Sequence, residues 1–171
     1  LLKRTEIAFF KNDIKDLTKI TNVFLPKFIN KQLNKTFYKG SLEGEFTIPF
    51  EPDGSIGADY GFFGKVSDAT INLTKEFSIR NLTTEINHIK TNDGDIFVVK
   101  INSGFIYDLE LSGSKINLKR IKNKAKTESI LKTKGKLNYS QIKKITTLFG
   151  LNINSIEDIN GEVDLKTIIN F

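Results

Sequence analysis

The side chains of this chain that could do chemistry are few and widely spaced. His88 is the only histidine among 171 residues, and there is no cysteine. A Ser-His-Asp relay would therefore depend on His88 alone, whose neighbours Asn87 and Ile89 form no catalytic motif. Thiolate sites and paired-histidine metal sites are excluded. We interpret His88 as an ordinary strand or turn position.

Two pairs of carboxylates, Glu43 with Glu45 and Asp108 with Glu110, are spaced two residues apart. Residues at this spacing share one face of a strand. Paired carboxylates hydrolyse glycosides when they flank a sugar cleft. However, the first pair alternates with Phe46 and its apolar neighbours, so it falls on the opposite, solvated face.

Two further patterns resemble ligand sites only superficially. Asp93-Gly94-Asp95 is not followed by the later oxygen ligands of a calcium loop, so it is interpreted as a turn. Gly54, Gly57, Gly61 and Gly64 lack the strand-then-helix context of a phosphate-binding loop and fit bulges or close strand packing. The sequence therefore predicts a protein that is not an enzyme and has no catalytic residue, metal or cofactor.

The charge is positive, with a formal value of +6 and a pI of about 9.4. Much of it lies between Lys115 and Lys136, where only Glu128 opposes the basic residues. Nucleic-acid sites usually add stacking aromatics or several arginines, whereas this stretch has no aromatic residue and only Arg120. We therefore expect no nucleic-acid partner. A lysine-rich hairpin tip, or attraction to anionic head groups, is the preferred interpretation.

Strict alternation of apolar and polar residues dominates the chain, and turn signals recur every 8–12 residues or so. The apolar phase is even-numbered up to Val66 and odd-numbered from Ala69, which predicts a bulge or break near Ser67-Asp68. Turns are expected at Pro52-Asp53-Gly54, Asn92-Asp93-Gly94, Asn102-Ser103-Gly104 and Ser112-Gly113-Ser114. The predicted strands are Thr5–Phe10, Leu42–Phe50, Ala58–Val66, Ala69–Leu73, Ile79–Ile86, Ile96–Ile101, Phe105–Leu111, Lys115–Ile121, Ile130–Tyr139 and Ile159–Leu165.

Short helices are predicted after a cap at Asn12 or Asp13, from Pro26, and from a cap at Ser140 to Gly150. No apolar run approaches the roughly 20 residues of a membrane span. The expected fold is mainly β: a long curved antiparallel sheet, either an open groove or a partly closed sandwich, with two or three short helices. Residues 1–171 are expected to form a single β-rich segment of a longer polypeptide.

Three segments resemble, in order and spacing, the AsmA-like envelope proteins of Gram-negative bacteria, especially the YhdP and TamB type. They are Phe24-Leu25-Pro26-Lys27-Phe28-Ile29, Gly40-Ser41-Leu42-Glu43-Gly44-Glu45-Phe46 and Gly64-Lys65-Val66-Ser67-Asp68-Ala69. The likeness extends over roughly Asn12 to Leu118 and rests on pattern, with no catalytic signature. It does not include the lysine-rich stretch or the helix from Ser140.

The resemblance implies a periplasmic protein that is anchored in the inner membrane through a segment outside this chain. Its apolar β-groove would carry phospholipid acyl chains between the inner and outer membranes, and its partners would be those chains and adjacent segments of the same polypeptide. The expected groove lining is Phe46, Ile48, Phe50, Tyr60, Phe62, Val66, Ile71, Leu73, Leu109 and Leu111. The alternative is that these residues form the core of a closed sandwich, a structural or binding module of the cell envelope without lipid transport.

Overall fold

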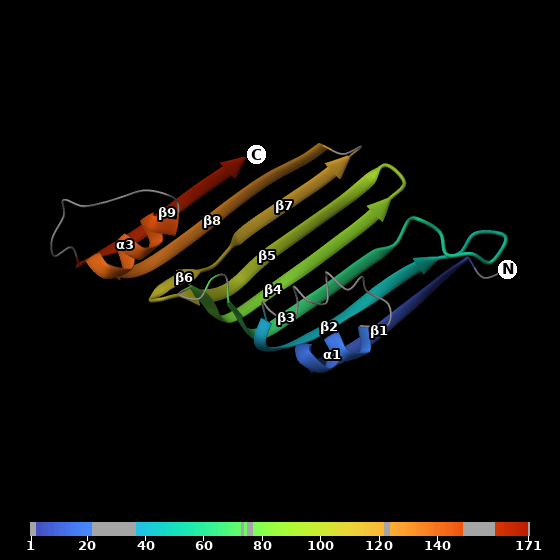
Figure 1. The fold of residues 1–171 in the computed structure, drawn as a ribbon, viewed down its shortest axis with the longest axis horizontal. Helices are drawn as coiled ribbons and strands as arrows, with labels where there is room; N and C mark the ends of the chain where they lie inside the picture. Colours follow the sequence, from blue (N-terminus) through green and yellow to red (C-terminus); the bar gives the residue numbers. More distant parts are fainter. Residues whose placement is uncertain are drawn as a thin grey trace.

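A computed structural model describes residues 3–21, 37–72, 74, 77–121, 124–148 and 160–170. In this part of the chain, all strands belong to one nine-stranded antiparallel sheet, accompanied by two short helices (Figure 1). The elements are β1 (Arg4–Asp13), α1 (Ile14–Thr21), β2 (Phe37–Pro49), β3 (Gly61–Asn72), β4 (Ser78–Thr91), β5 (Gly94–Ile106), β6 (Leu109–Leu111), β7 (Ser114–Ile121), β8 (Lys124–Asn138), α3 (Tyr139–Leu148) and β9 (Asn160–Asn170). The prediction of a mainly β chain with a long antiparallel sheet is confirmed.

The strands follow one another across the sheet almost in chain order, from β1 at one edge to β9 at the other (Figure 1). β6 and β7 both lie between β5 and β8. β7 pairs with the first part of each of these strands, and β6 pairs with the last part of β5 and a later part of β8. They are therefore two pieces of one strand, interrupted at Ser112-Gly113, where Gly113 has a φ of 63°. Every neighbouring pair is antiparallel, so the topology is a meander. The connections from β1 to β2 and from β8 to β9 are long and contain α1 and α3.

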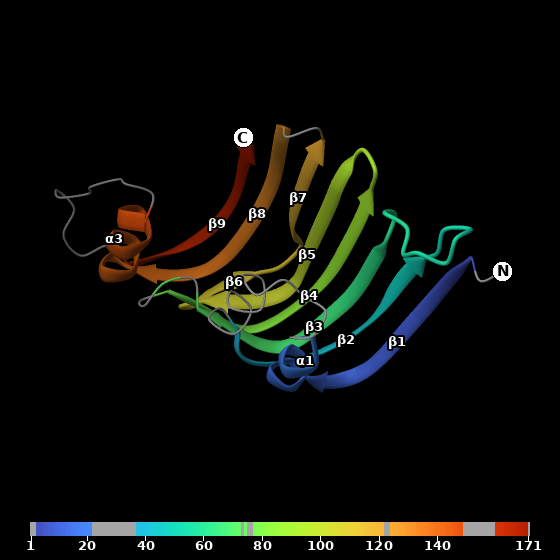
Figure 2. The same ribbon diagram turned by 45° about the vertical axis from the view of Figure 1, so that its right-hand side comes forward.

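The sheet is bent along its strands into a trough (Figure 2). A line of register shifts crosses it from β1 to β5, between Phe9 and Asn12 in the first strand and between Val66 and Ile71 in the third. Asp68 and Asn81 have φ values of 52° and 51°, a left-handed conformation that these residue types tolerate. The bulge predicted near Ser67-Asp68 is thus one of a row, and together they account for the bend.

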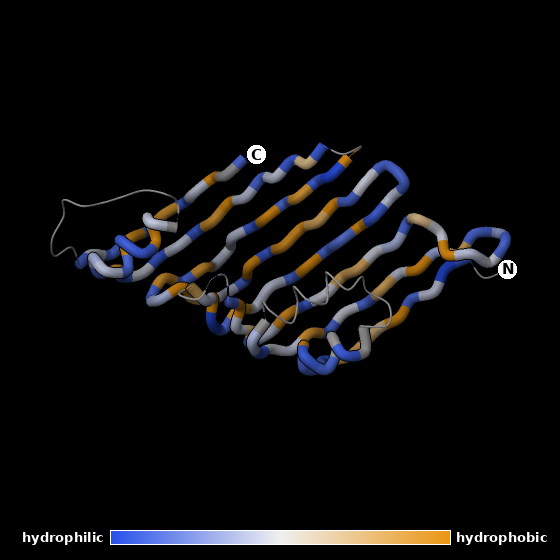
Figure 3. Tube along the Cα trace, viewed as in Figure 1, coloured by the Kyte–Doolittle hydropathy of each residue, from blue (hydrophilic) through white to orange (hydrophobic). Residues whose placement is uncertain are grey.

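The two faces of the sheet differ in charge, and they can be told apart because opposite residues of an antiparallel pair point to the same side. The inner face follows Phe46, Phe62, His88, Phe97 and Leu118, which are register partners across five strands. Residues offset by one form the outer face. This alternation is visible along each strand in Figure 3 as apolar and polar segments in turn.

Helix α1 lies on the inner side of the bend (Figure 2) and covers part of the apolar face. Its start is capped because the Asp13 carboxylate accepts a hydrogen bond from the Lys15 N–H at 2.7 Å. Ile14, only 4% exposed, joins a buried cluster with residues from β3, β4, β5 and β6. The other members of this cluster are Val66, Ala69, Leu82, Ile101 and Leu111.

Several sequence predictions are corrected in detail. The turn expected at Asn102-Ser103-Gly104 is absent, because β5 continues through it and reverses at Tyr107-Asp108 instead, with Tyr107 at a φ of 54°. Helix α3 is capped by Asn138, whose side-chain oxygen accepts from the Gln141 N–H at 2.9 Å, and not by Ser140. The helix expected from Pro26 and the end of that expected from Ser140 lie outside the described residues, as does Leu73.

Candidate functional site

The inner face is divided into a covered half and an open half, separated by the line of bulges. In the covered half, predicted groove residues Val66, Leu109 and Leu111 are buried, and Ile71 packs against the same cluster. Val66 and Leu111 belong to the buried cluster that Ile14 of α1 joins, whereas Leu109 is buried outside that cluster. In the open half, the remaining described candidates are only half-buried: Phe46, Ile48, Phe50, Tyr60 and Phe62.

The main feature of the open half is a row of rings running across the strands, which we call the aromatic row. It consists of Phe9 (β1), Phe46 (β2), Phe62 (β3), His88 (β4) and Phe97 (β5). The rings of Phe46 and Phe62 lie 4.7 Å apart, and those of His88 and Phe97 lie 5.9 Å apart. With strands spaced by about 4.8 Å, the row forms a nearly continuous apolar floor perpendicular to the strands.

Glycines make room for these rings. Gly44 and Gly64 are register partners next to the row on the inner face. A Cβ at Gly64 would meet the ring of Phe62, and one at Gly44 would come within 3.0 Å of the ring of Phe9. The rings of Phe62 and Phe9 therefore lean over the backbone of Gly64 and Gly44. This explains why glycines occur here without any phosphate-binding context.

The outer face carries a row of alternating charge beside exposed apolar side chains such as Phe63, Ile89 and Ile168. Glu43, Lys65, Glu85 and Lys100 are register partners across β2 to β5, with Glu43–Lys65 and Glu85–Lys100 distances of 4.0 and 3.7 Å. The carboxylate pair Glu43 and Glu45 lies on this face, as the sequence predicts.

Two other expectations about charged residues are corrected by the strand positions. Asp108 lies in the turn before β6, so it does not share a strand face with Glu110. The described part of the lysine-rich stretch extends along the outer face of β7 and β8, well beyond the hairpin tip, and residues 122–123 of that tip lie outside the described residues. Most of the excess positive charge of this stretch is thus displayed on the side away from the trough.

Charge also reaches the inner face at one place, which the sequence reasoning missed. Lys90, Asp95 and Arg120 are register partners on β4, β5 and β7, one step beyond His88, Phe97 and Leu118. We call these three residues the rim row. In the regularly paired parts of the described strands they are the charged side chains of the inner face, and the other inner positions are apolar, small or neutral polar. Each of them lies two residues from His88, Phe97 or Leu118 on the same strand, so the alternation of the sequence could have placed them on the inner face.

His88 connects the aromatic row to the rim row. Its Nε2 atom lies 3.4 Å from the Asp95 carboxylate, and its ring makes edge contacts with Tyr60 and Phe97. The Lys90 ammonium lies over the ring of Tyr60, 5.5 Å from its centre. His88 is therefore a strand residue, as the sequence predicts, held in an apolar floor with one polar contact at its edge.

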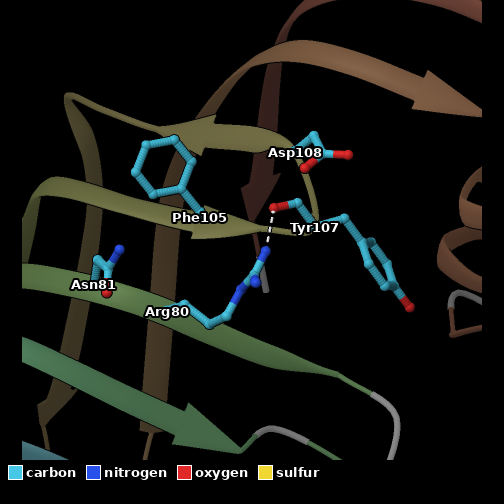
Figure 4. Close-up of a pocket in the computed structure, with 5 residues that line it drawn as sticks. All are labelled: Arg80, Asn81, Phe105, Tyr107 and Asp108. Atoms are coloured by element: carbon cyan, nitrogen blue, oxygen red, sulfur yellow. Dashed lines mark hydrogen bonds between the residues drawn. The ribbon is translucent and has the colours of Figure 1, made fainter.

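Two shallow pockets lie away from this surface. The first, of about 380 Å³, is bordered by Arg80, Asn81, Phe105, Tyr107 and Asp108. The Arg80 guanidinium already donates a hydrogen bond to the Tyr107 carbonyl at 2.8 Å (Figure 4). The second, of about 500 Å³, lies between the end of β8, the start of α3 and the start of β9. It is lined by Asp108, Lys136, Leu137, Asn138, Gln141, Asn160, Gly161 and Glu162. Neither combines an apolar interior with converging catalytic groups, as small-molecule sites usually do.

Among the described residues, no group of histidine and acidic side chains is arranged to hold a metal ion. The described helices are also too short and too polar to span a membrane. Comparison with family models, curated proteins and solved structures returned no match to this chain.

Proposed function

We propose that this chain is a segment of a periplasmic lipid-transfer protein whose open inner face binds phospholipid acyl chains. The observation that supports this most strongly is the separation of charge between the two faces of the sheet. Charge is concentrated on the outer face, whereas the aromatic row stays half-exposed on the inner face with no second sheet over it in the described part of the chain. Soluble monomers rarely leave such contiguous apolar surface open unless it binds something.

The energetics of an apolar floor suit a lipid ligand. Burial of each methylene contributes about 0.8 kcal/mol, so about ten methylenes on the floor would contribute roughly 8 kcal/mol before the costs of association. Such binding needs no directional chemistry. It is therefore compatible with acyl chains of different length, and it requires neither a cofactor nor catalysis.

The edges of the sheet suit the proposed partnership with adjacent segments of the same polypeptide. No described strand pairs with the outer edges of β1 and β9. Since all neighbours are antiparallel, β1 and β9 run in opposite directions, so a similar unit placed beside either edge would continue the sheet. Ile7 and Leu165, inner-face residues at the two edges, are 49% and 50% exposed, and they would be covered by such a neighbour.

The test is to isolate the chain from an envelope-directed expression and look for co-purifying phospholipid by native mass spectrometry. Phe62→Asp places a charge in the aromatic row and should abolish lipid retention. Phe63→Asp is the matched control, because Phe63 is the next residue of β3, points to the outer face and is 53% exposed. Circular dichroism checks that both variants keep the sheet.

Loss of lipid in Phe62→Asp but not in Phe63→Asp would support the proposal. A lipid-free wild-type protein, or equal lipid retention by both variants, would contradict it. The first of these results would favour a structural module of the envelope that carries no lipid.

A further inference from the structure

We propose that the rim row binds the phosphate of a lipid head group and so orients the lipid on the trough. This inference rests on the proposed function, since it takes the inner face as the acyl-chain surface. It concerns a different part of that face, where Lys90 and Arg120 flank Asp95 on neighbouring strands.

The position of these charges is the first argument. Elsewhere in the regularly paired strands that the structure describes, lysines and acidic residues point to the outer face. On β7, Lys119 points outward, whereas Arg120 points inward on the same face as Leu118. A charged row directly beside an apolar floor is the arrangement that an amphiphile requires, because its polar and apolar parts are joined covalently.

The contacts of the rim row are the second argument. Asp95 is close to His88, at 3.4 Å, and the Lys90 ammonium rests over the Tyr60 ring. Within the described part of the chain, neither Lys90 nor Arg120 lies within ion-pairing distance of a carboxylate. Both cations are therefore available to an anion, and an arginine can bind phosphate through two parallel hydrogen bonds.

The net charge of the row indicates which anion it suits. The two cations and one carboxylate of the rim row give it a formal net charge of +1. A phosphodiester carries a single negative charge, which this row balances. Inorganic phosphate has the same chemistry without acyl chains, so the experiment must separate the two sources.

The test is calorimetric titration of the whole chain with short-chain lipids. Dioctanoyl phosphatidylglycerol and dioctanoylglycerol share their acyl chains and differ in the phosphate head group. We expect the wild type to bind the phospholipid about tenfold more tightly, the range of one or two charge-assisted hydrogen bonds at a partly exposed site. Lys90→Gln combined with Arg120→Gln should remove this preference and leave dioctanoylglycerol binding unchanged.

The matched control is Lys115→Gln combined with Lys119→Gln, which removes the same charge from the outer face of β7. It should keep the tenfold preference. The inference is overturned if the rim variant keeps the preference, if the outer-face control loses it equally, or if inorganic phosphate binds as tightly as the phospholipid. Absence of binding by both lipids would instead refute the proposed function itself.

Discussion

Alanine substitutions in the two halves of the inner face should have opposite effects on folding and on binding. Phe62 lies in the open half and is half-buried, whereas Leu82 lies in the covered half and is 3% exposed. Both side chains point into the trough. The comparison therefore separates a residue that lines a ligand surface from one that belongs to the core.

The expected magnitudes follow from burial. Leu82→Ala removes a buried side chain from the cluster around Val66 and Ala69 and should lower the free energy of unfolding by about 3 kcal/mol. Phe62→Ala loses about half of a phenylalanine's burial energy, near 1 kcal/mol, and a ring pair with Phe46 worth up to about 1 kcal/mol more. We therefore expect about 2 kcal/mol for Phe62→Ala.

Binding should show the reverse order. Phe62→Ala removes part of the floor on which an acyl chain would lie, which should weaken binding of dioctanoyl phosphatidylglycerol by about 1 kcal/mol, or roughly fivefold. Leu82→Ala should change the affinity less than about twofold, because its site is covered. Urea unfolding followed by circular dichroism, together with calorimetric titration, measures both quantities. Unchanged affinity in Phe62→Ala, or an equal loss in Leu82→Ala, would refute the division into covered and open halves.

Two further pairs of substitutions test local features of the fold by urea unfolding. Gly94 has a φ of 153°, and a Cβ there would collide with the carbonyl of the facing strand, so Gly94→Ala should cost about 1–3 kcal/mol. Gly161→Ala, with open space around the added carbon, should stay within about 0.5 kcal/mol, and an equal cost at both sites would contradict this account. Asn138→Ala should cost about 1 kcal/mol by removing the cap of α3, whereas Ser140→Ala should be nearly neutral. A larger loss of stability in Ser140→Ala than in Asn138→Ala would indicate instead that Ser140 caps the helix.

The alternation of the sequence predicted the strands well because side-chain period fixes which face is buried. The clearest success is the bulge near Ser67-Asp68, read from a change of phase between Val66 and Ala69. The clearest failure is the turn placed at Asn102-Ser103-Gly104. Gly104 lies within β5. A Cβ there would press on Ile79 and Leu82, each at 3.2 Å, so the role of this glycine is close packing and not chain reversal.

The true reversal after β5 could not be read from turn chemistry. It uses Tyr107 at a positive φ, which is unusual for a bulky residue and is not among the turn signals. Tyr107 also makes an edge contact with Phe77, which directly precedes β4, with 5.5 Å between the ring centres. Long-range packing thus selects this turn, and a single local sequence window does not contain that information.

The sequence predicted which face of the sheet carries the candidate site, but not which residues of that face are open and which belong to the core. Alternation placed Phe46 and Phe62 on the same side as Val66, but only the position of α1 shows that Val66 is core and that the two rings are open. The rim row required one more step, the strand pairing that sets Lys90 beside Arg120 through Asp95. Each of these residues looks like ordinary surface charge when its strand is read alone.

The separation of charge between the two faces indicates that the inner face binds a ligand and is not simply half of a core that a second apolar layer would complete. A sheet that only awaited a second apolar layer would gain nothing from charged residues on its inner side, since burying Lys90 or Arg120 under such a layer would carry a large desolvation cost. Their position next to His88 and Phe97 keeps one boundary of the floor wet. A ligand with a polar end can satisfy both the apolar floor and this wet boundary, whereas a uniformly apolar covering layer cannot.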